Sequence, residues 1–179
     1  MAYFKLFIAQ SLDGYIASPN GSIDWLEAWP NPDQSDYGYS TFYETIGTVL
    51  MGRKTYETVL SFEDIPWHYS DSDCIVFTHQ KNLNIGSPRT ILLDQIDINI
   101  LNQLRKQSKK DLWVVGGGQL IRQFLELGAI DEMIISTVPI LIGQGLPLFP
   151  SGHYYQGFKT IGVQQFESGI TNLQLQKIS

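Results

Sequence analysis

Short apolar segments alternate with amphipathic segments along most of this chain, and this alternation restricts the possible folds more than any other feature. The segment from Tyr3 to Ala9 is apolar except for Lys5, which is typical of a strand buried on both faces of a parallel sheet. Further strands of this kind are predicted over residues 48–51, 73–78, 90–93, 112–115 and 132–138. The order of these segments predicts an α/β fold with a mainly parallel central sheet flanked by helices.

The segments between the predicted strands carry apolar side chains at helical spacing. In the first of them, positions i, i+3, i+4 and i+7 are occupied by Tyr39, Phe42, Tyr43 and Ile46. Ser35 or Asp36 is the predicted N-terminal cap of this helix. Other helices are predicted over residues 53–60, after the capping residue Asp97, and after Gly118.

Two further features complete the expected fold. Residues 23–36 are rich in Trp, Pro and Asp and predict a long irregular loop, a kind of segment that is often functional in compact domains. Residues 158–166 and 171–178 alternate between apolar and polar side chains around Ser168-Gly169, which predicts a C-terminal antiparallel hairpin. Because the chain shows no internal repeat or linker, one domain over residues 1–179 is expected.

The composition excludes several classes of protein. Hydrophobic residues make up 43% of the chain and charged residues 17%, which supports a packed core and argues against disorder. The net charge of −6 argues against nucleic acid as the main partner, because such a partner needs a basic face. Cys74 is the single cysteine and lies in a predicted strand, so we interpret it as a packing thiol rather than a nucleophile.

Targeting segments and metal motifs are not recognised in the sequence. The start of the chain lacks the basic segment and cleavage site of a signal peptide, and no apolar run approaches the roughly 18 residues of a membrane span. We therefore expect a cytoplasmic protein that does not contact a membrane. His68, His79 and His153 lack paired ligand spacing, so no metal site is predicted. Glu63 and Asp64 are interpreted as solvated loop charges.

A glycine joins a predicted strand to a predicted helix at Gly52, and two cations and a hydroxyl follow it. Arg53, Lys54 and Thr55 open the helix, where free backbone N–H groups already attract anions. The helix dipole disfavours cations at this end, so their presence points to a bound phosphate that compensates them. A solvated basic pair on a loop is the alternative interpretation.

Three successive glycines, Gly116, Gly117 and Gly118, join a second strand to a second helix. Without Cβ atoms the backbone passes close to a ligand, and the helix start beyond it would bind a pyrophosphate. The alternative is a tight turn with close packing of helix on sheet. The run is not a Rossmann fingerprint, because Ile121 stands where that motif needs its third glycine. It is not a P-loop either, because no Gly-Lys-Ser/Thr follows.

Four motifs, taken together, resemble those of the dihydrofolate reductase superfamily. They are residues 51–57 with the basic helix start, 113–118 with the three glycines, 11–17 with the sequence Ser-Leu-Asp-Gly-Tyr-Ile-Ala, and 131–149. The last two resemble one branch, which contains the reductase domain (RibD C-terminal domain) of the bacterial riboflavin-biosynthesis deaminase-reductase and small stand-alone relatives. The resemblance spans nearly the whole chain and implies a dihydrofolate-reductase-like fold.

The resemblance implies NADPH as hydride donor and assigns residues to it position by position. The phosphates would be held by Gly52, Arg53, Lys54 and Thr55, and the adenosine 2′-phosphate by Thr78, His79 and Gln80. The pyrophosphate would be held by Gly116, Gly117, Gly118, Gln119 and Leu120. Ala9 and Ile16 would flank the nicotinamide, and Gly21 would belong to a mobile loop over it.

The substrate side departs from the folate-reducing members, which carry an acid near the start of the first helix. Asp24 and Asp36 are the acids nearest that place, and no carboxylate stands around Gly38, where a close match would have it. Burial of Asp24 beside Trp25 would suit it to proton donation, with turn capping as the alternative. Trp25 and Trp29 are predicted walls of a pocket for a flat heterocycle.

The resemblance therefore implies an NADPH-dependent reductase of the riboflavin-biosynthesis type, acting on a small heterocyclic or ribosylamine substrate. A dihydrofolate or pterin reductase and a non-catalytic nucleotide-binding module are the alternatives. The chain lacks the His-x-Glu and Cys-x-x-Cys signature of a fused zinc deaminase. The resemblance also implies a homodimer.

Overall fold

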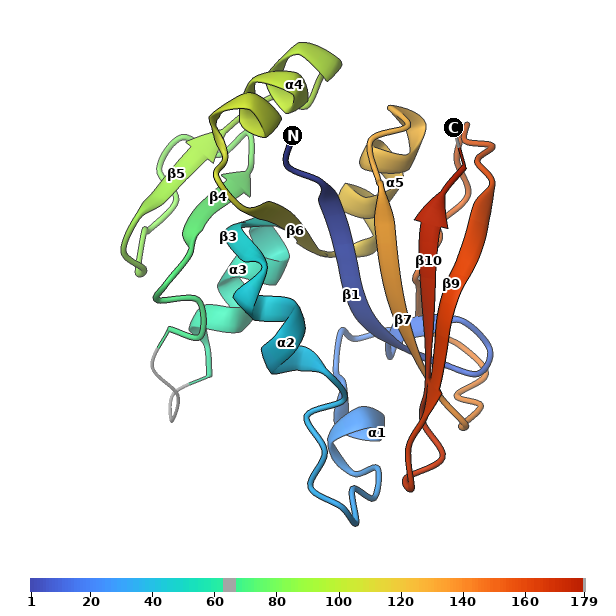
Figure 1. Cartoon of the computed structure of the whole chain (residues 1–179). Helices are drawn as coiled ribbons and strands as arrows, with labels where there is room; N and C mark the ends of the chain where they lie inside the picture. Colours follow the sequence, from blue (N-terminus) through green and yellow to red (C-terminus); the bar gives the residue numbers. More distant parts are fainter. Residues whose placement is uncertain (63–66, 179) are drawn as a thin grey trace.

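The computed structural model describes residues 1–62 and 67–178, so Glu63 and Asp64 lie outside the described residues. The strands of the main sheet are β1 (Phe4–Ser11), β3 (Ile46–Gly52), β4 (Asp73–Phe77), β5 (Thr90–Leu93), β6 (Asp111–Gly116), β7 (Glu132–Val138), β9 (Phe158–Gln165) and β10 (Thr171–Lys177). In the described part of the chain they form one sheet in the order β5-β4-β3-β6-β1-β7-β10-β9 (Figure 1). Neighbouring strands from β5 to β7 run parallel, whereas β10 and β9 run antiparallel to their neighbours.

Five helices are described, and four of them cover the two faces of the sheet. They are α1 (Asp24–Glu27), α2 (Tyr39–Glu44), α3 (Arg53–Leu60), α4 (Ile98–Gln107) and α5 (Gly118–Glu126). One buried layer contains Leu101 of α4 and Phe124 of α5, and the other contains Phe42 of α2 and Tyr56 of α3. Helices α4 and α5 therefore cover one face, and α2 and α3 cover the other. Within the residues described, no helix has both the length and the apolar character needed to cross a membrane.

The alternation of side chains along each strand explains why the central strands are apolar throughout. Leu50 of β3 belongs to the layer under α4 and α5, whereas Val49 and Met51 belong to the layer under α2 and α3. Cys74 of β4 is fully buried in this second layer, and burial raises the pKa of its thiol to about 11. The predicted parallel sheet with helices on both faces is confirmed, as is the predicted C-terminal hairpin, which β9 and β10 form.

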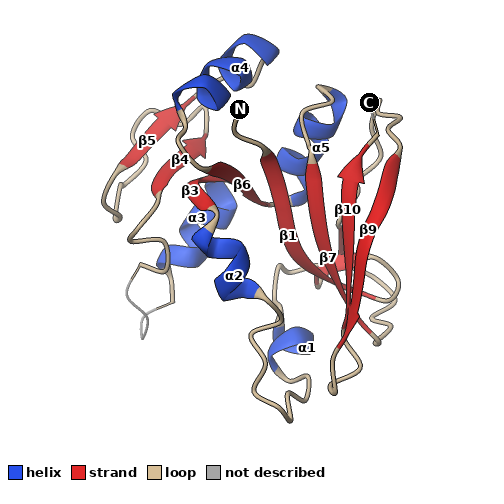
Figure 2. Cartoon of the chain, viewed as in Figure 1, coloured by secondary structure: helices blue, strands red, loops and turns tan. Residues whose placement is uncertain are grey.

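The boundaries of several elements follow local signals in the sequence. Asp97 caps α4, because its Oδ1 accepts hydrogen bonds from the backbone N of Asn99 (2.7 Å) and Ile100 (2.9 Å). Strands β5 and β7 have the predicted bounds. The prediction that Ile46 lies on a helix is wrong, because α2 ends at Glu44 and Ile46 begins β3. The predicted irregular loop over residues 23–36 also contains one turn of helix, α1 (Figure 2).

A two-stranded ribbon lies outside the main sheet. It consists of β2 (Tyr15–Ala17) and β8 (Leu146–Pro147), which pair in antiparallel orientation. The backbone N of Leu148 donates to the carbonyl of Gly14 at 3.0 Å, which holds the ribbon next to the turn after β1. The ribbon therefore stands at the carboxyl end of the central strands, because β1 ends at Ser11.

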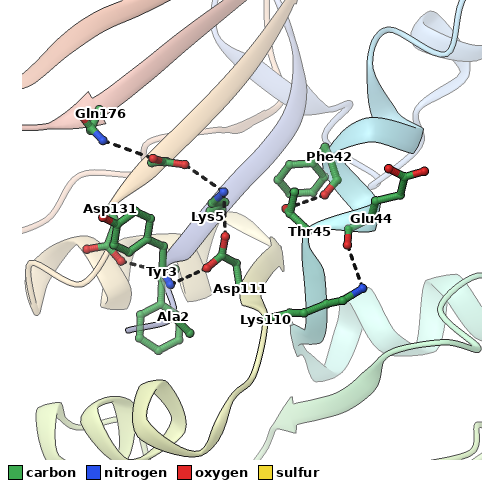
Figure 3. Close-up of polar contacts among 12 residues, drawn as sticks. Ala2, Tyr3, Lys5, Phe42, Glu44, Thr45, Lys110, Asp111, Asp131 and Gln176 are labelled. Atoms are coloured by element: carbon green, nitrogen blue, oxygen red, sulfur yellow. Dashed lines mark hydrogen bonds and ion pairs between the residues drawn. The ribbon is translucent and has the colours of Figure 1, made fainter.

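Charged residues tie together the amino-terminal ends of β6, β1 and β7 (Figure 3). The Lys5 Nζ lies 2.8 Å from a carboxylate oxygen of Asp111 and 3.1 Å from one of Glu132. Asp111 also accepts a hydrogen bond from the backbone N of Tyr3 (2.9 Å), and the Gln176 side chain donates to Glu132 (3.3 Å). This cluster has a structural role, because its charges are paired with one another at the end of the sheet opposite the ribbon.

The Lys5 cluster predicts a stability change at alkaline pH. Burial alone would lower the pKa of Lys5, but its hydrogen bonds and ion pairs with Asp111 and Glu132 outweigh burial and raise the pKa above its ordinary value of 10.5. The stabilisation is therefore complete below pH 10.5 and is lost as the pH rises through the pKa of the folded state.

We expect the difference in unfolding free energy between the natural chain and Lys5→Met to shrink above pH 10.5. Urea unfolding of both proteins between pH 7 and about pH 12 measures it. A difference that stays constant over this range contradicts the prediction.

Candidate functional site

The structure brings the two predicted glycine turns together. β3 and β6 are neighbours in the sheet, and Met51 pairs with Gly116. A Cβ atom placed on Gly52 would lie 3.8 Å from the carbonyl oxygen of Gly116, and one on Gly117 would lie 3.4 Å from the Thr55 Oγ1. The turn before α3 and the turn before α5 therefore form one continuous surface at the carboxyl ends of β3 and β6.

The connections that leave this surface diverge. The chain leaves β3 through α3 and enters β4 on one side, whereas it leaves β6 through α5, passes β1 and enters β7 on the other side. In open α/β sheets, ligands bind at the carboxyl ends of strands whose connections diverge in this way. The topology alone thus marks this edge as the candidate site.

Both helices at this edge begin after a glycine, which has no side chain to cap their first backbone N–H groups. α3 has the N-cap Gly52 and α5 has the N-cap Gly117, and neither helix has a side-chain cap or an acid in its first turn. The free N–H groups and the positive ends of two helix dipoles therefore meet within one surface, which attracts anionic groups. Gly116 is buried and has φ +132°, a backbone conformation that favours glycine, and no atom lies within 4 Å of the place of its Cβ. The peptide bond between Gly116 and Gly117 is cis.

Charged and hydroxyl side chains border the first turn. The Arg53 guanidinium contacts the Glu57 carboxylate on the same helix at 2.8 Å, and the two side chains are 38% and 44% exposed. An exposed pair of this kind contributes only about 0.3–0.5 kcal/mol, so an anionic ligand readily displaces Glu57 as the partner of Arg53. Lys54 is exposed and Thr55 is half-buried.

The residues assigned to the adenosine 2′-phosphate follow β4, the next strand beyond β3. His79 and Gln80 are exposed, and the Thr78 Oγ1 accepts a hydrogen bond from the backbone N of Gln80 at 3.0 Å. On α5, Gln119 is exposed, whereas the side chain of Leu120 is buried in the core. The Leu120 N–H group donates to the carbonyl of Gly117 at 2.9 Å, so neither its side chain nor its N–H group is left to contact a ligand.

The β2–β8 ribbon packs directly against the start of α5. A Cβ atom on Gly118 would lie 2.8 Å from the carbonyl oxygen of Pro147, and one on Gly145 would lie 2.2 Å from that of Ala17. Ile16, assigned to the nicotinamide, is half-buried on this ribbon. Ala9 is half-buried on β1, and Gly21 occupies a turn with φ +89° in which its backbone N donates to the carbonyl of Ser18.

Sequence reasoning missed Asp13, which holds the ribbon in place. Its carboxylate accepts hydrogen bonds from the Ser11 hydroxyl (2.6 Å) and from the backbone N of Gly143 (2.8 Å) and Ile142 (3.3 Å). The bond from Ser11, followed by those from the backbone, lowers the pKa of Asp13. The signal was available in the sequence as a Ser-x-Asp-Gly turn directly after an apolar strand.

The two candidate acids lie in different surroundings. Asp24 is exposed at the start of α1, so the expected burial beside Trp25 is not found. Asp36 is exposed and accepts hydrogen bonds from the backbone N of Gly38 (2.8 Å) and Ser40 (2.9 Å), which caps the start of α2. Its bonds from Ser40 and Gly38 lower the pKa of Asp36. A lowered pKa is the opposite of what a proton donor near neutral pH needs.

The two candidate pocket tryptophans are both half-buried but differ in their hydrogen bonds. The Trp29 indole donates to the carbonyl of Ser168 at 3.0 Å, which attaches the loop to the β9–β10 hairpin. The Trp25 indole Nε1 is buried and has no hydrogen-bond partner among the residues described. Trp25 thus keeps a donor available, whereas the donor of Trp29 is used within the fold.

Comparison with known proteins identifies the family of the chain. Residues 2–172 match the family model described as the RibD C-terminal domain. The Bacillus subtilis (strain 168) protein YwjB is 36% identical over 171 residues, which cover 92% of each chain. A solved Shewanella sp. PV-4 structure, named for riboflavin biosynthesis, is 32% identical with a TM-score of 0.87 over 100% of both chains.

A more distant comparison identifies the fold. Dihydrofolate reductase from Enterococcus faecalis, solved in complex with NADP(H), is 14% identical with a TM-score of 0.68, covering 99% of this chain and 97% of that one. The fold is therefore dihydrofolate-reductase-like, as the motifs predicted. The similarity in sequence and structure over nearly the full length shows that the chain belongs to the RibD C-terminal domain family.

Proposed function

We propose that this protein is an NADPH-dependent reductase that transfers a hydride to a small heterocyclic or ribosylamine substrate. One observation carries the proposal, namely the two uncapped helix N-termini that meet at the carboxyl ends of β3 and β6. A dinucleotide has several phosphates at fixed spacing, and two adjacent anion sites suit such a ligand better than a single phosphate. Membership of the RibD C-terminal domain family supports the same conclusion.

The residues present fit this cofactor. The glycine turn at residues 116–118 and the first N–H groups of α5 would hold the pyrophosphate, and Arg53, Lys54 and Thr55 would hold phosphate groups at the start of α3. When bound, NADPH supplies the hydride from its nicotinamide ring. The protein would contribute positioning, since Ala9 and Ile16 would hold the ring against the substrate.

Water is the proton source that best fits the site. The carboxylates described between Asp13 and Asp36 are all exposed, and Asp36 is engaged in capping α2. Asp24 remains the candidate acid closest to Trp25, and its exposure lets it exchange protons with solvent. The same observation favours a second candidate function, a non-catalytic nucleotide-binding module, because a buried acid is not found among these residues.

Titration with NADPH and NADH, followed by quenching of tryptophan fluorescence, tests the proposal directly. We expect NADPH to bind with micromolar affinity and Arg53→Ala to weaken it about tenfold or more, which corresponds to roughly 1.4 kcal/mol. The reason is the loss of a charge-assisted hydrogen bond to a phosphate.

Arg122→Ala is the matched control. Arg122 forms a similar pair with Glu126, four residues later on α5. The substitution therefore removes the same charge as Arg53→Ala, but away from the start of the helix. NADPH affinity should be unchanged in this variant. If the natural chain binds neither nucleotide, the two glycine turns have only a structural role. This result would contradict the proposed function.

The rate of NADPH oxidation separates the candidate functions. A panel containing a pyrimidine ribosylamine, dihydrofolate and a quinone covers the substrate classes under consideration. Turnover of the ribosylamine supports the proposed reductase, and turnover of dihydrofolate supports the pterin alternative. Binding of NADPH without turnover of any of them favours the non-catalytic module. The homodimer implied by the family resemblance stays a prediction.

A further inference from the structure

A buried polar pair lies on neighbouring strands near the candidate substrate side. Ser136 of β7 is 6% exposed and Asn172 of β10 is 2% exposed. The Ser136 hydroxyl donates to the Asn172 Oδ1 at 2.6 Å, and the Asn172 Nδ2 donates to the backbone carbonyl of Tyr37 at 2.7 Å. The pair therefore connects the sheet to the loop before α2, across 135 positions of sequence.

The pair stands in one row with a residue assigned to the nicotinamide. Ala9 of β1 pairs with Ser136, and Ser136 pairs with Asn172, so the three side chains share one face of the sheet. Phe7 and Ile134, two residues earlier on β1 and β7, pack against the layer that contains α2 and α3. The row thus lies on the α2 face, at the carboxyl ends of β1 and β7.

A buried amide in this position needs its hydrogen bonds. Leaving a buried polar group unpaired is unfavourable, so the Asn172 amide retains its place only while the Tyr37 carbonyl accepts from it. The backbone it holds is unusual, because Tyr37 has φ +54° and Gly38 has φ +84°. Glycine adopts a positive φ freely, so Tyr37 is the residue whose conformation needs its surroundings to hold it.

Other contacts attach the same segment to the same hairpin. The Tyr37 ring packs edge-to-face on Phe166 with centroids 5.0 Å apart, and the Trp29 indole donates to Ser168. Both of these contacts are made by half-buried side chains, whereas the Asn172 side chain is buried within the sheet. Asn172 is therefore the contact that joins the segment from Trp29 to Gly38 to the interior of the sheet.

We propose that Asn172 is a positioning residue that, through the Tyr37 carbonyl, sets the separation between the segment 29–38 and the carboxyl ends of β1 and β7. This separation determines how large a substrate fits beside the nicotinamide. The consequence for substrate size rests on the proposed function. The effect of Asn172 on the position of the segment 29–38 does not depend on the proposed function.

Asn172→Asp tests the proposal without changing the size of the side chain. At a pH above the pKa of this buried carboxyl, an ionised carboxylate would face the Tyr37 carbonyl, and two acceptors cannot hydrogen-bond to each other. We expect the hydrogen-exchange protection of the backbone amides of Tyr39, Ser40 and Phe42 to fall about tenfold relative to the natural chain. As the pH is lowered toward about 5, the carboxyl regains its proton and donates again, so protection should return.

Other charges near position 172 do not obscure this test. Its cross-strand partners Ser136 and Gln164 are uncharged. Asp36, on the attached segment, has a lowered pKa and stays ionised over the same range. A role of Asn172 limited to filling space would produce no recovery of protection at low pH, because the two forms of the carboxyl have the same volume.

Two further variants complete the experiment. Ser136→Ala removes the donor to Asn172 with little change in packing, so it should lower protection of the same amides several-fold even if Asn172→Asp does not fold. Gln174→Leu removes a side-chain amide two residues further along β10. It should leave the hydrogen-exchange protection of the backbone amides of Tyr39, Ser40 and Phe42 unchanged. Natural protection in Asn172→Asp at every pH up to about 9, lack of recovery at low pH, or natural protection in Ser136→Ala would each overturn the proposal.

NADPH titration of the same variants separates this proposal from the proposed function. The glycine turns belong to β3 and β6, and β7 and β10 lie beyond β1, so NADPH affinity should stay within about twofold of the natural value. The KM for a substrate that is turned over should change instead. If the natural chain does not bind NADPH, the proposed function fails, whereas the exchange result still decides the role of Asn172.

Discussion

Gly118→Ala is expected to weaken NADPH binding at least about a hundredfold, because the added Cβ atom meets backbone on the neighbouring ribbon. It would lie 2.8 Å from the carbonyl oxygen of Pro147 and 3.2 Å from the Pro150 ring. Neither neighbour is the end of a flexible side chain, so the start of α5 or the β2–β8 ribbon has to move. Overpacking of this kind costs about 1–3 kcal/mol of stability.

The effect on binding follows from where the displacement occurs. Hydrogen bonds from backbone N–H groups to a charged phosphate contribute about 1.5–3 kcal/mol each, and loss of two of them corresponds to a hundredfold or more. Fluorescence titration with NADPH measures the affinity, and urea unfolding measures the stability of the same protein.

Gly157→Ala is a matched control for this substitution. A Cβ atom at Gly157 would lie 3.4 Å from the terminal carbon of Ile178, which is an ordinary contact with a side chain. We expect this variant to bind NADPH normally. Natural affinity in Gly118→Ala would show that the N-terminus of α5 does not contact the cofactor.

Arg105→Leu should cause the largest loss of stability, about 3–5 kcal/mol, without touching the candidate site. The guanidinium lies on α4 and contacts the Asp131 carboxylate at 2.5 Å, and it donates to the carbonyls of Ala2 (3.2 Å) and Ala129 (2.7 Å). It also lies 4.5 Å from the centroid of the Phe4 ring. The side chains of Arg105 and Asp131 are only 13% and 24% exposed, so removing the cation leaves a poorly solvated carboxylate unpaired.

A double variant shows whether the unpaired charge causes this loss. Asp131→Asn keeps an oxygen that can accept from the backbone N of Phe4, which now donates to the carboxylate at 2.7 Å, but removes the negative charge. We expect Arg105→Leu/Asp131→Asn to recover at least about 1 kcal/mol relative to Arg105→Leu alone. Urea unfolding supplies both values, and a loss below about 1 kcal/mol in the single variant would contradict the prediction. NADPH affinity should be unchanged, since the pair lies at the opposite end of the sheet.

Features that depend on neighbouring residues could be predicted from the sequence. Continuous apolar runs predicted the parallel strands, because a strand covered on both faces needs apolar side chains at every position. Asp97 was identified as a cap because the residues it bonds lie two and three positions later. The two glycine turns were found in the same way, since each is a short local motif. These turns, together with the motifs at residues 11–17 and 131–149, predicted the correct family.

Contacts between residues far apart in the sequence became known from the packing of the finished elements. Met51 pairs with Gly116, Trp29 reaches Ser168, and Asn172 holds Tyr37, and no periodicity in the sequence encodes these contacts. The sequence offered Asp36 both as a helix cap and as a catalytic acid. The structure favours the cap, because the carboxylate accepts from the backbone N of Gly38 and Ser40 and these bonds lower its pKa. The physical reason is that a strand or helix follows from interactions within a few residues, whereas a site follows from how finished elements pack.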